Sequence, residues 1–108
     1  MIKAVIVEDE EASRLTLKNY VSKYCEGVEI VGEADGVKNG ISVIREAKPD
    51  LVFLDVEMPV MGGLEACSAL RQKGSPARIA MLSSKTSAEA HLAGRQAGCD
   101  NYLVKPPH

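Results

Sequence analysis

Short apolar runs recur along the chain, and longer segments with apolar residues at helical spacing separate them. The runs at 4–7 and 51–54 are unbroken and rich in branched side chains, which is typical of parallel strands buried on both faces. The run at 28–34 alternates more, so we expect its strand nearer an edge of the sheet. Together the runs predict five strands, at about 2–8, 28–34, 51–55, 78–82 and 101–104.

Helices are predicted in the intervals between these strands. Over about 11–25, apolar and small residues recur at three- and four-residue steps and define one face of a helix: Ser13, Leu17, Tyr20, Val21 and Tyr24. Two further helices have the same spacing, marked by Val37, Ile41 and Ile44, and by Leu64, Cys67 and Leu70. A fourth begins with the capping box Thr86 to Glu89 and has few large apolar side chains, so we expect it to pack weakly. This alternation favours an α/β fold, a doubly wound parallel sheet with helices on both faces.

Composition narrows the class of protein. A chain of 108 residues with 45% apolar content suits one compact domain, here spanning 1–108. The net charge of −2 gives no footprint for nucleic acid or for an anionic membrane. No apolar segment approaches the about 20 residues that cross a bilayer, and no signal peptide opens the chain, so we expect a cytoplasmic protein. The three cysteines are far apart without C-x-x-C spacing, which favours reduced packing residues over a zinc site.

Acidic side chains follow two of the predicted strands at the point where each ends. Glu8 and Asp9 come after the first strand, and Asp55 ends the third. If these strands are neighbours, the three carboxylates meet at the carboxyl edge of the sheet, where α/β proteins build their sites. Clustered carboxylates repel one another unless a hard cation neutralises them, and Mg²⁺ suits carboxylate oxygens. The sequence therefore indicates a magnesium site.

Further polar residues end the fourth and fifth strands. Ser83 and Ser84 follow the fourth, and Lys105 follows the fifth. A single aspartate after a strand is more often a turn or a helix cap, and a single lysine before proline is usually solvated. The conjunction of acids, a hydroxyl and a lysine at successive strand ends nevertheless favours phosphoryl chemistry.

These residues resemble the receiver domain of two-component response regulators over nearly the whole chain. The resemblance lies in ordered motifs: Val7-Glu8-Asp9-Glu10, Pro49-Asp50-Leu51-Val52-Phe53-Leu54-Asp55-Val56-Glu57-Met58-Pro59, Gly62-Gly63-Leu64-Glu65, Met81-Leu82-Ser83-Ser84, Ala97-Gly98 and Tyr102-Leu103-Val104-Lys105-Pro106. The first half looks like receivers that precede LytTR-type DNA-binding domains. The resemblance implies a flavodoxin-like sheet with strand order 2-1-3-4-5.

The resemblance also implies a role for each residue of the site. Asp55 looks like the phosphoacceptor, with Mg²⁺ held by Glu8, Asp9, Asp55 and the backbone carbonyl of Glu57. Ser83 looks like a switch hydroxyl that donates to a phosphoryl oxygen, and Lys105 like the lysine that pairs with phosphoryl oxygens. Tyr102 looks like the switch aromatic whose rotamer follows Ser83.

The implied function is that of a signalling domain rather than an enzyme, although such a domain catalyses its own phosphorylation and dephosphorylation. The implied partners are a histidine kinase or a histidine phosphotransfer protein, and an effector domain or output partner. Neither nucleic acid nor membrane is expected to bind this domain directly. The family carries a fifth helix after the Lys-Pro pair, whereas this chain stops at His108. We therefore expect either a domain truncated before its last helix or a partner, another copy included, that covers the exposed face.

One other function class competes with this interpretation, and two nucleotide-binding folds fail for want of their motifs. A phosphorylation-independent interaction module would keep the fold without the switching, and such receivers usually lose part of the set Glu8, Asp9, Asp55, Ser83 and Lys105, which is intact here. A dinucleotide-binding Rossmann unit would need G-x-G-x-x-G after its first strand, and the sequence has none. A P-loop is excluded because G-x-x-x-x-G-K-[ST] is absent from the sequence.

Overall fold

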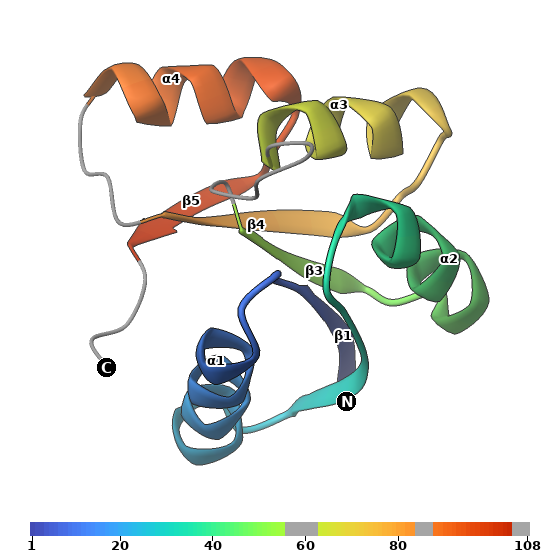
Figure 1. Cartoon of the computed structure of the whole chain (residues 1–108), viewed down its shortest axis with the longest axis vertical. Helices are drawn as coiled ribbons and strands as arrows, with labels where there is room; N and C mark the ends of the chain where they lie inside the picture. The colour runs from blue at the N-terminus through green and yellow to red at the C-terminus, as the bar shows by residue number, and fades with distance from the viewer. Residues whose placement is uncertain (56–62, 84–87, 105–108) are drawn as a thin grey trace.

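The structure, a computed structural model, describes residues 1–55, 63–83 and 88–104 (Figure 1). Strands and helices alternate along it in the order β1 (Ile2–Val7), α1 (Glu11–Tyr24), β2 (Val28–Ala34), α2 (Val37–Ala47), β3 (Leu51–Asp55), α3 (Gly63–Gln72), β4 (Arg78–Ser83), α4 (Ala88–Ala97) and β5 (Asn101–Val104). The predicted elements are confirmed to within about two residues at each end. The capping box expected at Thr86 lies outside the described residues.

In the described part of the chain the strands form one parallel sheet of order β2-β1-β3-β4-β5. This confirms the doubly wound, flavodoxin-like order. The more alternating strand, β2, lies at an edge as expected, and the unbroken apolar strands β1 and β3 lie side by side inside the sheet. A strand buried on both faces has no need for alternation, which explains the difference in pattern.

Two apolar cores lie on opposite faces of the sheet. On one face, alternate strand residues such as Val5, Val7 and Leu54 pack with α2 and α3. On the other face, Ile6 and Phe53 pack with Leu17 and Val21, the buried residues of α1. Figure 1 shows α1 alone on its side of the sheet, with α2, α3 and α4 on the other. The side that carries only α1 agrees with the expected lack of a fifth helix in the described residues.

The apolar stripe predicted on the first helix is only partly correct. Leu17 and Val21 are buried, but Tyr20 is exposed and Tyr24, the last residue of α1, is 65% exposed. The two tyrosine rings instead lie against each other with centroids 5.3 Å apart. Helical periodicity predicts the direction in which a side chain points, but it cannot tell whether another element lies there.

The cysteines are reduced, as expected, but they do not all fill the core. Cys67 and Cys99 are buried, whereas Cys25 is exposed. Burial raises the pKa of the Cys67 thiol to about 11, so this thiol stays protonated and behaves as a small apolar side chain. The packing interpretation is therefore confirmed for two cysteines and wrong for Cys25. Separately, no described helix has the length and apolar content that crossing a membrane requires.

Candidate functional site

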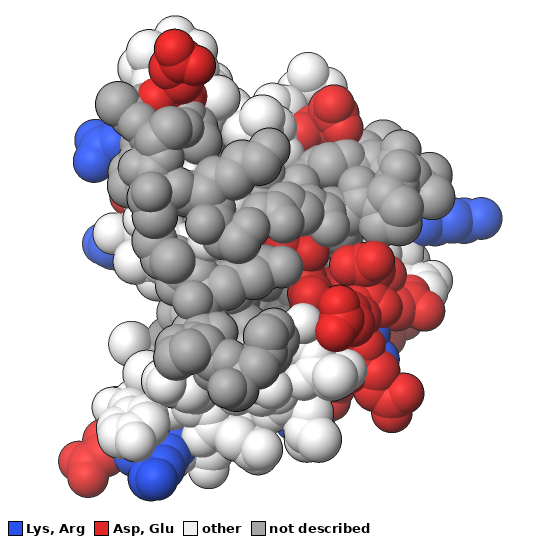
Figure 2. All heavy atoms as spheres, turned by 60° about the vertical axis from the view of Figure 1, so that its left-hand side comes forward, with Lys and Arg blue, Asp and Glu red and all other residues white. Residues whose placement is uncertain are grey.

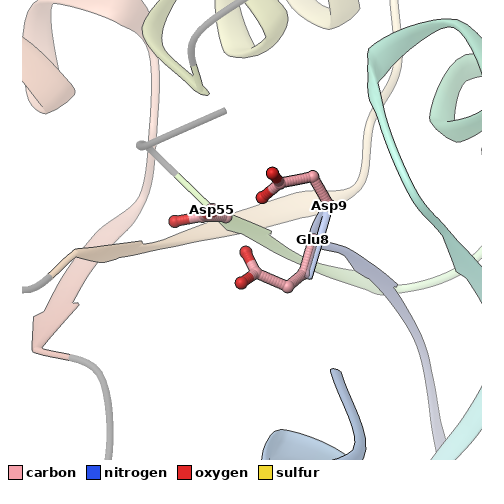
Figure 3. A group of neighbouring side chains, drawn as sticks. All are labelled: Glu8, Asp9 and Asp55. Carbon is pink, nitrogen blue, oxygen red and sulfur yellow. The ribbon is translucent and has the colours of Figure 1, made fainter. Parts of the chain in front are cut away.

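Three carboxylates meet at the carboxyl edge of the sheet, as the sequence predicted. β1 and β3 are paired with Val7 opposite Leu54, so the residues that follow them lie side by side. Glu8, Asp9 and Asp55 each offer one oxygen within 4.8 Å of the others. Figure 3 shows the three side chains arranged around one small space, two coming from the end of β1 and one from the end of β3.

Burial makes this grouping costly without a cation. Glu8 is 5% exposed and Asp55 only 1%, whereas Asp9 is exposed. Two carboxylates at such a separation repel each other by about 3 kcal/mol at an effective dielectric of about 20. Figure 2 shows that acidic side chains also gather on the surface over this part of the molecule, with few basic ones among them. An all-oxygen, acidic donor set of this kind fits a hard divalent cation such as Mg²⁺.

Ser83 lies on the same edge as the carboxylates. It is the last residue of β4 and is fully buried. In the pairing of β3 with β4, Asp55 lies opposite Leu82, so Ser83 is one position further along the neighbouring strand. The structure thus brings the predicted switch hydroxyl next to the predicted acceptor strand.

Tyr102 lies further from the edge and connects β5 with α4. It is opposite Met81 in the sheet and is half-buried. Its ring packs so closely under α4 that a Cβ atom added at Gly94 would lie 2.7 Å from the Tyr102 Cδ2 atom. A change in the tyrosine rotamer would therefore alter the contact between β5 and α4.

Three predicted site positions lie outside the described residues. They are Glu57, Ser84 and Lys105. The backbone ligand assigned to Glu57 and the phosphoryl contact assigned to Lys105 therefore stay predictions.

Arg14, which no sequence motif singled out, holds the loop that carries two of the acids. Its Nη1 atom donates to the backbone carbonyl of Glu8 at 2.8 Å and to that of Asp9 at 3.4 Å. Its Nε atom lies 3.5 Å from Oε1 of Glu33, and the other carboxylate oxygen of Glu33, Oε2, accepts from Lys18 Nζ at 2.6 Å. A basic residue one helical turn after the acidic pair was the available signal, but nothing in a sequence distinguishes it from a solvated one.

The pKa of the Glu33 carboxyl lies below its ordinary value. The hydrogen bond from Lys18 is the main cause, partial burial opposes it, and the charges of Lys18 and Arg14 reinforce it. Glu33 therefore stays ionised as an anchor for both basic side chains.

Comparison with known proteins identifies one family. Residues 4–108 match the family described as the response regulator receiver domain. The response regulator MprA of a Mycobacterium species (strain KMS) is 37% identical over 105 residues, which is 97% of this chain and 44% of that protein. MprA of Mycolicibacterium vanbaalenii is 36% identical with the same coverage. The chain thus spans less than half the length of these relatives.

Solved structures give the same fold. The receiver domain of the putative response regulator NarL from Mycobacterium tuberculosis superposes with a TM-score of 0.88 at 26% identity, covering 99% of this chain and 86% of that one. The chemotaxis protein CheY4 of Vibrio cholerae superposes with a TM-score of 0.85 at 29% identity, covering 100% of this chain and 89% of that one. A LuxR-family regulator from an Aurantimonas species has a TM-score of 0.89 at 27% identity, covering 97% and 74%. The expected likeness of the first half to LytTR-type regulators gains no support from these matches.

Proposed function

Because the chain belongs to the response regulator receiver domain family, we propose that it is a phosphoacceptor signalling domain and that Asp55 receives the phosphoryl group. The observation that carries the proposal is the convergence of Asp55 with Glu8 and Asp9 within 4.8 Å. A purely structural aspartate at a strand end has no need of two further carboxylates beside it. Their mutual repulsion lowers stability, and such groupings persist where a ligand requires them.

The proposed reaction takes a phosphoryl group from a phosphohistidine of a partner protein. A carboxylate oxygen of Asp55 forms the new bond to phosphorus while the bond from phosphorus to the imidazole nitrogen breaks, and the electron pair stays on that nitrogen. In the transition state, charge spreads over the oxygens of the transferring phosphoryl group. Positioning and charge neutralisation therefore matter more than an acid or a base. Ser83, fully buried at the end of β4, is proposed to donate its hydroxyl to one of these oxygens, and Lys105 to pair with another.

Glu8, Asp9 and Asp55 are the residues proposed to hold Mg²⁺, with the backbone carbonyl of Glu57 as a further ligand. Bound there, the cation neutralises the acids and the oxygens of the phosphoryl group. Figure 3 shows the carboxylates of buried Glu8 and exposed Asp9 on different sides of the space that they share with Asp55.

The proposed readout runs through Ser83, Tyr102 and α4. The acyl phosphate adds about one to two negative charges at Asp55, which would attract the Ser83 hydroxyl. A shift of the β4 end would free space for Tyr102, whose ring packs against α4 at Gly94. The surface formed by α4 and β5 would then differ between the two states.

The proposed partners follow from this chemistry. A histidine kinase or a histidine phosphotransfer protein would supply the phosphoryl group, and an effector domain, an output partner or a second copy of the chain would recognise the changed surface. The domain would act in the cytoplasm and would catalyse its own phosphorylation and dephosphorylation without being an enzyme for another substrate.

The test is intact-mass spectrometry after incubation with acetyl phosphate and Mg²⁺. We expect one added phosphoryl group on the wild type, none after chelation of the metal, and none on Asp55→Asn. Asp50→Asn is the matched control, because Asp50 lies at the opposite end of the same strand and should leave labelling unchanged. Equal labelling of Asp55→Asn would refute the assignment of the acceptor. A wild type that labels with neither acetyl phosphate nor a phosphorylated histidine protein would favour the phosphorylation-independent interaction module.

A further inference from the structure

We propose that Arg14 is a positioning residue that sets the metal affinity of the acidic site without touching the metal. The inference rests on the proposed function, since it concerns the same Mg²⁺ site. It assigns to Arg14 the task of holding the backbone of Glu8 and Asp9, so that their side chains are presented together to the cation. The sequence position alone, in the first turns of α1, does not suggest this role.

The contacts of Arg14 connect the acidic loop, residues 8–10 between β1 and α1, with the end of β2. Its guanidinium donates to the carbonyl of Glu8 at 2.8 Å and, less closely, to that of Asp9 at 3.4 Å. On its other side it lies 3.5 Å from the carboxylate of Glu33. The amide of Glu8 donates to the carbonyl of Ala34 at 3.0 Å, and Ala34 is the neighbour of Glu33 in β2. The backbone of Glu8 is therefore held through both its N–H and its C=O.

The chemistry of the guanidinium suits this position. Five N–H donors in a planar fork can serve two carbonyls and a carboxylate at once, whereas an ammonium is a single donor atom at the end of a flexible stem. The side chain of Arg14 is 18% exposed, against 39% for Lys18, which binds the same glutamate from solvent. Arg14 is thus the more fixed of the two cations around Glu33.

The mechanical consequence concerns the two metal-binding acids of this loop. Asp9 is exposed and lies between the end of β1 and the start of α1, so its own side chain is not fixed by packing. Because Arg14 already restrains the loop through its carbonyls, less conformational entropy is lost when the loop becomes ordered around a metal ion. Residues that orient metal ligands in this way typically change affinity by about 10–100-fold when they are replaced.

A simpler interpretation is that Arg14 only stabilises the start of α1 and the pairing with β2. Lys18 distinguishes the two interpretations of Arg14, because it also pairs with Glu33, at 2.6 Å, but contacts neither the Glu8 nor the Asp9 carbonyl. Replacing either residue by methionine keeps the aliphatic stem and removes one cation beside Glu33. Only Arg14→Met also removes the restraint on the acidic loop.

The experiment is a calorimetric Mg²⁺ titration of the wild type, Arg14→Met, Lys18→Met and Arg14→Lys, with the thermal unfolding midpoint of each measured without metal. We expect Arg14→Met to weaken Mg²⁺ binding about tenfold, at the lower end of the usual range for residues behind a metal ligand. Lys18→Met should change it by less than about twofold, as for an exposed ion pair. Arg14→Lys keeps the charge but lacks the fork, and should regain only part of the affinity. Should Arg14→Met fail to fold, Arg14→Gln takes its place in the same comparison.

The outcomes separate this inference from the function on which it rests. Equal Mg²⁺ affinity in Arg14→Met and Lys18→Met would overturn the positioning role while leaving the metal site intact. Full recovery in Arg14→Lys would also overturn it, because charge alone would then account for the effect. A wild type that binds no Mg²⁺, or an Asp9→Ala variant that binds it unchanged, would instead remove the metal site itself.

Discussion

The two ends of the sheet use aspartate in opposite ways. At the amino end, Asp50 accepts a hydrogen bond from the Lys3 amide at 3.0 Å. Asp100 accepts from the Ile79 amide at 2.8 Å and from Arg71 at 2.7 Å. At the carboxyl end, Asp55 lies among other carboxylates. Asp50 and Asp100 at the amino end tie loops to strands, whereas the acids around Asp55 at the carboxyl end are concentrated as like charges.

One residue type thus serves stability at one edge of the sheet and binding at the other. An aspartate that accepts from backbone amides and an arginine favours the folded state. A cluster of carboxylates disfavours it until a cation arrives. The carboxyl end is also where parallel strands lead into loops, so its acids can be gathered from β1 and β3 at once. Four variants or pairs of variants test this contrast.

The largest effect should come from removing the arginine of the amino end. Arg71 donates to the carbonyls of Gly98, Ser75 and Ala77 as well as to Asp100. Arg71→Met should lower the free energy of unfolding by about 2–3 kcal/mol, a figure kept modest because the pair is partly exposed. Denaturant unfolding is the measurement, and the exposed Arg78, also at the amino end, provides the control Arg78→Met. A loss no larger than that of the control would show that this end is not held by side-chain hydrogen bonds.

The next effect concerns the turn that Arg71 supports. Gly98 has a φ of +104°, and a Cβ atom there would lie 2.9 Å from Arg71 Cγ. Gly98→Ala should cost about 2 kcal/mol, combining backbone strain with displacement of the arginine. Gly74 has a φ of +79° with nothing near its Cβ position, so Gly74→Ala should cost only about 1 kcal/mol. Chemical denaturation of the two variants compares them directly, and equal losses would mean that the arginine contact adds nothing.

The carboxyl end should respond to metal instead. At a Mg²⁺ concentration ten times the dissociation constant, the wild type should gain about 1.4 kcal/mol of stability through linkage. Asp9→Asn should gain less than half of this, yet it should be slightly the more stable protein without metal, because one like charge is gone. Thermal unfolding with and without Mg²⁺ measures both. An Asp9→Asn variant that is less stable than the wild type in metal-free buffer would contradict the idea that these acids are held against repulsion.

The smallest effect is a titration at the paired acid of the carboxyl end. The pKa of Glu33 is lowered in the folded state, chiefly by its hydrogen bond from Lys18, so ionised Glu33 favours folding above its ordinary pKa. This contribution is lost as the pH falls through the lowered pKa. Carbon-detected NMR should show the Glu33 carboxyl titrating below its usual range, and Lys18→Met should move it back further than Arg14→Met does. The reverse order would mean that Arg14, not Lys18, is the principal partner of Glu33.

Much of the fold could be predicted because its signals are local. The unbroken runs that became β1 and β3 predict buried strands, and the stronger alternation at 28–34 predicts the edge strand β2. Tyr24 shows the limit of such local signals. It lies on the predicted face of the helix, but its expected burial was wrong. The direction of a side chain depends on local geometry, but burial depends on which element arrives from elsewhere.

The residue pattern alone places Glu8 and Asp9 directly after one strand and Asp55 at the end of another, and hence all three at one edge of a parallel sheet. The pairing of β1 with β3, which brings the acids within 4.8 Å of one another, is a property of the folded chain. The contact of Arg14 with the acidic loop and the reach of Arg71 to Asp100 across the fold likewise follow from tertiary packing. Long polar side chains outside the apolar core have no periodic signature, because their partners are set by packing between distant segments rather than by the pattern around them.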